Sequence, residues 1–155
     1  MNVKKIAGEV VAALPADAGF EDLDEFLFER AQVEEGREDC EAGRVLSARD
    51  VLGDAAADLS AVVWAQSAAD LFREASDAHD DREAFVAAVV EAARVLARGT
   101  ESSVTLPEMG DATIRERHLA TERRRYRVIY DTRGSTHRVL WFTNNTTCYR
   151  NVRPG

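Results

Sequence analysis

The N-terminal part of the chain has the apolar spacing of amphipathic helices. Apolar residues recur every three or four positions over residues 3–14, which predicts a first helix that Pro15 ends. A second helix of about 16 residues is predicted to begin at Asp17 or the next residue and to stop at Gly43, with Gly36 weakening it. The predicted helices of residues 1–55 are short and this segment is acidic overall, so we expect them to pack on the rest of the chain.

The rest of the chain has the pattern of an α+β domain. After an extended piece at Val45-Leu46 and a helical turn capped by Ser47, the run at residues 60–64 predicts a short buried strand. Two helices follow, one capped by Ser67 and one capped by Asp80 or Asp81 and ended at Gly99. Three strands then come at about 112–120, 123–131 and 136–143. The sequence therefore predicts two helices packed on an antiparallel sheet, with the N-terminal helical segment wrapped on that domain.

Alternation within the strands assigns side chains to faces of the sheet. Tyr126, Val128 and Tyr130 are expected on one face, and Arg125, Arg127 and Ile129 on the other. The same alternation pairs Val139 with Trp141 on one face, and Leu140 with Phe142 on the opposite face. Each predicted strand contributes arginine, so one face could gather several.

The net charge of −8 conceals a strong asymmetry along the chain. Residues 1–55 carry a net charge of −8, residues 56–110 carry −6, and residues 111–155 carry +6. All ten basic residues of the last segment are arginine, whose planar guanidinium suits phosphate and carboxylate. Two interpretations are consistent with this charge distribution. The C-terminal arginines could form a face that binds anions, or the acidic N-terminal segment could bind the basic C-terminal segment.

Several classes of protein are disfavoured by composition. No apolar run approaches the length of a membrane span, and the N-terminus fits an amphipathic helix better than a signal peptide. The two cysteines, Cys40 and Cys148, form no CxxC pair and have no histidine at metal-ligand spacing. We therefore expect a cytoplasmic protein with no disulfide framework, no metal site and no cofactor.

The segment from Val62 to Tyr149 resembles the RelE/ParE superfamily of toxins from bacterial toxin–antitoxin pairs. Several pieces carry the resemblance. A short opening strand is followed by the segment AQSAADLFREA and by a long helix that ends in ARVLARG. The segments IRERHLATERRRYRVIYD and HRVLWF come after them. YRVIYD, residues 126–131, is the most characteristic piece, because these toxins commonly have a tyrosine–arginine–apolar–apolar–tyrosine strand there.

The segment from Leu14 to Leu52 resembles the small antitoxins encoded just upstream of such toxins. Those antitoxins often have a leucine–proline start, an acidic amphipathic helix, and a glycine–arginine–valine followed by a serine cap. The residues that match are Gly36, Asp39, Gly43, Arg44, Val45, Ser47 and Val51. The tandem resemblance implies an antitoxin, residues 1–55, fused ahead of its toxin, residues 56–155. The anchors expected on the toxin are Phe20, Leu23, Phe26, Leu27, Val45, Leu46, Val51 and Leu52.

The resemblance also implies roles for individual residues. RelE-like toxins cut messenger RNA on the ribosome, and Arg127 matches their strand arginine, which would stabilise the phosphorane charge. Tyr149 is the candidate for their late tyrosine, and His118 is the nearby group whose ordinary pKa suits acid–base work. The residues expected to hold RNA are Arg115, Arg117, Arg123, Arg124, Arg125, Asn144 and Asn145. Asn144-Asn145 stands where many relatives carry paired basic residues, a departure that favours an inactive toxin.

Each of these roles has a structural alternative. The C-terminal arginines could instead pair with acids of residues 17–41, which we consider the more common arrangement, or simply be solvated. Tyr126, Tyr130, Trp141 and Phe142 fit a core better than a base-stacking platform, and His118 fits an ordinary strand histidine.

Covalent fusion favours an intact chain that is self-neutralised. A short linker gives an effective concentration on the order of mM, so a contact of ~1 µM would leave about a thousandth of the molecules open. The ribosome with mRNA, or DNA gyrase as for ParE-like relatives, would be the external partner. Operator DNA is not expected, because residues 1–55 have no basic module. A homodimer, and a non-enzymatic binding or immunity module on a degenerate toxin fold, stay open as alternatives.

Overall fold

The computed structural model describes residues 2–99, 104–106, 109–111, 113–120 and 125–144. Its elements are α1 (Val3–Ala13), α2 (Phe20–Glu41), β1 (Val45–Ser47), α3 (Ala48–Leu52), a 3₁₀ turn η1 (Asp54–Ala56), β2 (Val62–Ala65), α4 (Gln66–Asp77), α5 (Arg82–Ala97), β3 (Val104–Thr105), β4 (Arg115–Ala120), β5 (Arg125–Arg133) and β6 (Thr136–Thr143). The α+β prediction is confirmed, as is the order of strand, two helices and three longer strands. The short strand β3 lies between the predicted helix that ends at Gly99 and the first of the three longer predicted strands.

The six strands form one sheet in the order β1-β2-β6-β5-β4-β3. The prediction of an antiparallel sheet is wrong at one position, because β2 pairs with β6 in parallel, with Val62 opposite His137. The chain passes through two helices and three strands between β2 and β6, and this long connection allows β6 to return in the same direction. The strand β1, from the N-terminal segment, extends the sheet at its edge by pairing antiparallel with β2.

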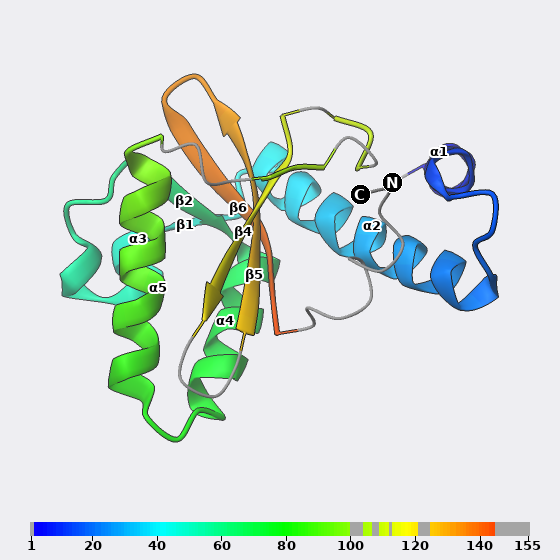
Figure 1. Ribbon diagram of the computed structural model, residues 1–155. Helices are drawn as coiled ribbons and strands as arrows, with labels where there is room; N and C mark the ends of the chain where they lie inside the picture. The colour runs from blue at the N-terminus through cyan, green and yellow to red at the C-terminus, as the bar shows by residue number, and fades with distance from the viewer. Residues whose placement is uncertain (1, 100–103, 107–108, 112, 121–124, 145–155) are drawn as a thin grey trace.

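Helices cover both faces of the sheet (Figure 1). On one face, α3, α4 and α5 enclose a core whose aromatic centre contains Trp64, Phe72, Phe85, Tyr126 and Phe142. On the other face α2 crosses the sheet, and α1 packs on α2 (Figure 1). This second core joins residues of both helices to the sheet: Ile6, Val10, Phe26, Val33, Leu106, Met109, Ile114, Ile129, Leu140 and Trp141. No helix in the described part of the chain is long and apolar enough to cross a membrane.

Local signals at the helix ends are largely as predicted. The hydroxyl of Ser47 accepts a hydrogen bond from the amide of Asp50, and Asp81 caps α5 by accepting from Ala84. Gly43 follows α2 in the left-handed region, at φ +77°. The second helix, however, has 22 residues and continues through Gly36. Its start lies at Phe20, because the carboxylate of Asp22 accepts the amide of Gly19.

A β-bulge at Leu140 changes the expected assignment of faces. Ile129 pairs with Trp141 while Tyr130 pairs with Val139, so Leu140 is the extra residue. Val139 and Trp141 consequently lie in different cores, on opposite faces, contrary to the prediction. The expected separation of Tyr126, Val128 and Tyr130 from Ile129 is confirmed.

Gly36 brings α2 into direct contact with this bulge. A Cβ atom built at Gly36 would overlap the carbonyl oxygen of Leu140 and crowd its Cα. The buried Gly36 therefore allows α2 to approach the sheet closely. A glycine inside a helix is less stable than alanine, and the close contact offsets this loss.

Gly36→Ala should lower the free energy of unfolding by about 2 kcal/mol, because the added methyl must push α2 away from β6. Gly8→Ala is the matched control: Gly8 lies inside α1 with no atom within 4 Å of a built Cβ, so alanine there should stabilise by about 0.5–1 kcal/mol. Urea unfolding of both variants measures the difference. If Gly36→Ala stabilises the protein as Gly8→Ala does, the close contact is not what Gly36 provides.

Candidate functional site

Arg127, the candidate phosphate-stabilising residue, lies in the sheet face that α2 covers. Its Nη1 donates to Oε1 of Glu29 in α2 at 2.5 Å, and its Nη2 donates to Oε2 of Glu116 in β4 at 2.8 Å. The guanidinium also lies over the ring of Trp141, with 5.6 Å from Cζ to the centroid. Arg127 is 1% exposed, so in this arrangement it is closed off from solvent.

The electrostatics of this cluster favour a permanently charged guanidinium. Burial alone would lower the pKa of Arg127, but the carboxylates of Glu29 and Glu116 outweigh that effect and raise it above its ordinary value. Both carboxylates are themselves buried, and Glu116 also contacts His118. The group is therefore an ion triplet formed between the N-terminal segment and the sheet.

A second set of charges ties α2 to the ends of β5 and β6. Arg138 donates to both carboxylate oxygens of Asp131, at 2.7 and 2.6 Å, and lies 3.9 Å from Glu41 of α2. The hydrogen bonds that Arg138 donates to Asp131 raise the pKa of Arg138, although burial opposes this. Two of the described C-terminal arginines, Arg127 and Arg138, thus contact acids of α2, as the pairing alternative predicts, although the shortest contacts of Arg138 are with Asp131 of the sheet.

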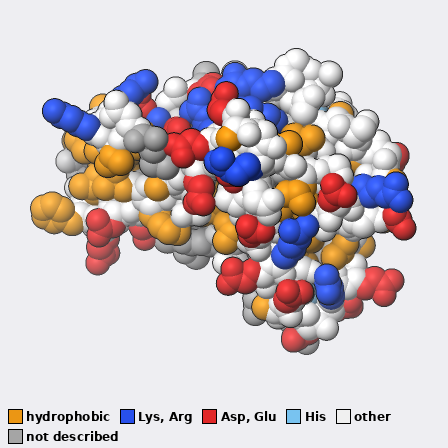
Figure 2. All heavy atoms as spheres, turned by 180° about the vertical axis from the view of Figure 1, so that it is seen from behind, with side chains coloured by type: hydrophobic (Ala, Val, Ile, Leu, Met, Phe, Trp, Pro, Cys, Tyr) orange, Lys and Arg blue, Asp and Glu red, His pale blue; other side chains and the backbone are white. Residues whose placement is uncertain are grey.

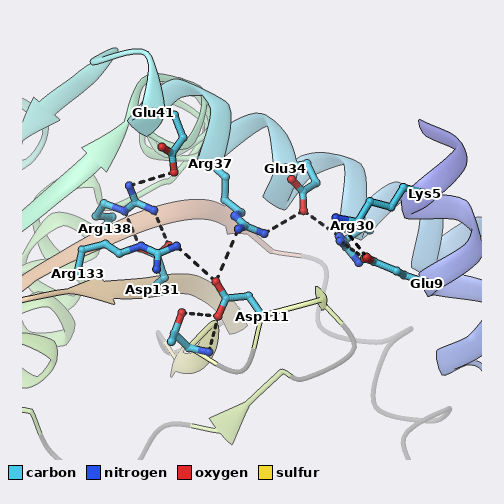
Figure 3. A network of polar contacts seen from close by, with 11 residues as sticks. Lys5, Glu9, Arg30, Glu34, Arg37, Glu41, Asp111, Asp131, Arg133 and Arg138 are labelled. Carbon is cyan, nitrogen blue, oxygen red and sulfur yellow. Dashed lines mark hydrogen bonds and ion pairs between the residues drawn. The ribbon is translucent and has the colours of Figure 1, made fainter. Parts of the chain in front are cut away.

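The same network continues along α2 to α1 (Figure 3). Asp111 lies between Arg37 of α2, at 3.6 Å, and Arg133 of β5, at 3.4 Å. Further along the helix, Arg30 bonds Glu34 at 3.0 Å and Glu9 of α1 at 2.5 Å. Alternating charges therefore connect α1, α2 and the sheet along one line.

Of the expected RNA-binding arginines that the structure describes, Arg115 and Arg117 do not lie beside Arg127. In β4, Arg115 and Arg117 pair opposite Tyr130 and Val128, which places them on the sheet face of α4 and α5, away from Arg127. Arg125 and Asn144 are exposed. Arg123, Arg124, Asn145 and Tyr149 lie outside the described residues, so their roles remain predictions.

The expected anchors divide into three groups. Phe26 and Leu52 are buried, and Leu23, Leu27, Leu46 and Val51 are partly buried against the two cores. Phe20 and Val45 are wrong as anchors, because their side chains are 88% and 41% exposed. Phe20 is the first residue of α2, ahead of the part that meets the sheet. Seen from behind, hydrophobic side chains gather toward the end of the molecule formed by α1 and α2 (Figure 2).

Sequence reasoning missed Glu29 and Glu116 as site residues, and it selected Asp39 without predicting its partners. A signal existed for Glu29, since it lies three residues after Phe26 and four before Val33, on the apolar face of α2. A charged residue at such a position indicates a buried partner. Among the described residues, no three His, Cys, Asp or Glu side chains are grouped to hold a metal ion.

Asp39, near the end of α2, caps another helix. Its Oδ2 accepts the amide hydrogen of Ser67 in α4 at 2.8 Å, and its Oδ1 accepts from Arg44 at 2.9 Å. Ser67 is therefore inside α4 and is capped by α2, whereas the sequence had predicted Ser67 as the cap. Burial opposes ionisation of Asp39, but the hydrogen bonds from Ser67 and Arg44 prevail and lower its pKa below the ordinary 3.8.

Asp39→Asn should lower the free energy of unfolding by about 1 kcal/mol at neutral pH, because asparagine keeps an oxygen that caps α4 but loses the negative charge. Because the pKa of Asp39 is lower in the folded protein than in the unfolded chain, its ionised carboxylate stabilises the fold at pH values above the unfolded pKa of 3.8. This stabilisation disappears as the pH falls through the folded pKa. The difference between wild type and variant should therefore shrink below about pH 4. Urea unfolding from about pH 3 to 7 tests this, with Asp24→Asn, exposed on α2, as control. A difference that is constant with pH would contradict it.

Comparison with known proteins supplies no relative. No protein-family model, no curated protein and no solved structure matches the chain. Any function must therefore be argued from the site itself.

Proposed function

We propose that the chain is a fused toxin–antitoxin protein, in which residues 1–55 neutralise a RelE/ParE-like domain, residues 56–155, in cis. The target of that domain, when active, would be ribosome-bound mRNA or DNA gyrase. Arg127 would stabilise phosphorane charge in the RNA-cleaving version, with His118 and Tyr149 as acid–base candidates.

The observation that carries this proposal is the hydrogen bond from Arg127 to Glu29, at 2.5 Å. The residue that the toxin resemblance selects as functional is bonded to an acid from the segment that resembles an antitoxin. A helix that covers the arginine and neutralises its charge would block both substrate access and phosphate stabilisation.

The residues of the antitoxin-like pattern give further support. Gly36 contacts the backbone of Leu140, Asp39 caps α4, and Arg44 accepts the amide of Gln66 through its carbonyl oxygen at 3.0 Å. These positions make the contacts that hold the N-terminal segment to the other segment, as expected for a neutralising partner.

One observation favours the alternative, a non-enzymatic binding or immunity module on a degenerate toxin fold. Glu116, the second acid on Arg127, belongs to the toxin-like segment itself. Arg127 would therefore keep an acidic neighbour after α2 had left, which reduces its use for phosphate.

Growth of cells expressing residues 57–155 tests the proposal. We expect arrest of growth, relief by residues 1–55 supplied in trans, and no relief by the same segment carrying Glu29→Arg, which would repel Arg127. Cleavage of ribosome-bound mRNA by the fragment should fall about 10²–10³-fold with Arg127→Ala, the loss typical of a removed transition-state donor. The intact chain should be harmless.

The outcomes separate the two candidates. A fragment that is folded by circular dichroism yet harmless and without cleavage activity rules out the RNA-cleaving version and favours the binding module. An intact chain that cleaves ribosome-bound mRNA rules out neutralisation in cis.

A further inference from the structure

A cavity of about 400 Å³ lies between α3, α4 and α5, away from the Arg127 triplet. Its apolar lining comes from Val51 and Leu52 of α3, Phe72 of α4 and Val86 of α5. A volume of this size accommodates a small molecule. Because α3 belongs to the antitoxin-like segment and α4 and α5 belong to the toxin-like segment, a bound molecule would contact both segments.

The polar lining of this cavity carries both signs of charge. Arg73 and Arg82 contribute guanidinium groups, and Asp50 and Asp77 contribute carboxylates. The ion pairs of the arginines are long and exposed: Arg82 lies 3.6 Å from Asp77, and Arg73 lies 3.8 Å from Asp70. Exposed ion pairs of this length are weak, so each arginine can exchange its present carboxylate partner for a charged group of a ligand.

A buried hydroxyl in the cavity wall points to a missing polar partner. Ser76 is 1% exposed and lines the cavity, and its Oγ has no hydrogen-bond partner within the described part of the chain. A buried polar atom without a partner is costly, and a ligand that bonds it would remove that cost.

We propose that this cavity binds a small zwitterion with an apolar body, the chemistry of a free hydrophobic amino acid. Its carboxylate would pair with Arg73 and Arg82 and accept a hydrogen bond from the hydroxyl of Ser76. Its ammonium would pair with Asp50 and Asp77, and its side chain would lie on the apolar lining. The balance of two cations and two anions favours a zwitterion, because a ligand of one sign would meet repulsion as well as attraction.

Titration of the ¹⁵N-labelled full chain with L-phenylalanine, followed by NMR, tests the proposal. We expect saturable shifts at Ser76 and Gly53 with a Kd of about 1 mM or tighter. N-acetyl-L-phenylalanine, which lacks the ammonium, and L-phenylalaninamide, which lacks the carboxylate, should each bind about tenfold more weakly.

Matched variants locate the site. Arg82→Gln and Asp77→Asn should weaken binding about tenfold. Two exposed residues outside the cavity lining serve as controls: Glu83→Gln, on α5, and Arg98→Gln, at the residue that follows α5, should leave binding unchanged. The absence of saturable shifts up to about 10 mM, equal affinity for either derivative, or insensitivity to Arg82→Gln and Asp77→Asn would each overturn the proposal. None of these readouts depends on whether the toxin-like segment is active.

Discussion

The burial of Arg127 between two carboxylates is the interaction on which the arrangement of the two segments depends. A guanidinium removed from water needs acids close by, since an unpaired buried charge costs several kcal/mol. Glu116 comes from the neighbouring strand, but Glu29 comes from α2. Undocking α2 would remove one of these acids and at the same time expose the apolar residues Ile129, Leu140 and Trp141. Charge and hydrophobic burial therefore both oppose separation.

Three positions on α2 fix how closely it lies on the sheet. Glu29, Gly36 and Asp39 follow one another at spacings of seven and three residues, so they share a helix face. Glu29 meets Arg127, Gly36 meets the bulge at Leu140, and Asp39 caps α4. Close packing at the middle position brings the two acids within hydrogen-bond distance of their partners.

Local chemistry could be predicted from the sequence, and long-range pairing could not. The caps at Ser47 and Asp81 and the order of elements depend on neighbouring residues, and they were predicted correctly. The direction of β2 beside β6 and the bulge at Leu140 were not, because alternation with period two encodes neither strand direction nor an extra residue.

The same limit applies to the site. The opposite charges of the two ends of the chain indicated pairing, yet charge totals do not say which acid meets which arginine. The pairing of Arg127 with Glu29 spans 98 residues and depends on the docking of α2. Phe20 was misassigned for a related reason: apolar spacing predicts a helix face but not where the opposite surface begins.

A double-mutant cycle on Glu29 and Arg127 tests the central claim most directly. Glu29→Ala, Arg127→Ala and the double variant, unfolded in urea, should give a coupling energy of about 2–3 kcal/mol, the range for a buried, hydrogen-bonded pair. The exposed pair Arg49–Asp54, at 3.0 Å, provides the reference and should give less than about 1 kcal/mol. A coupling between Glu29 and Arg127 as small as that of the reference pair would contradict the account.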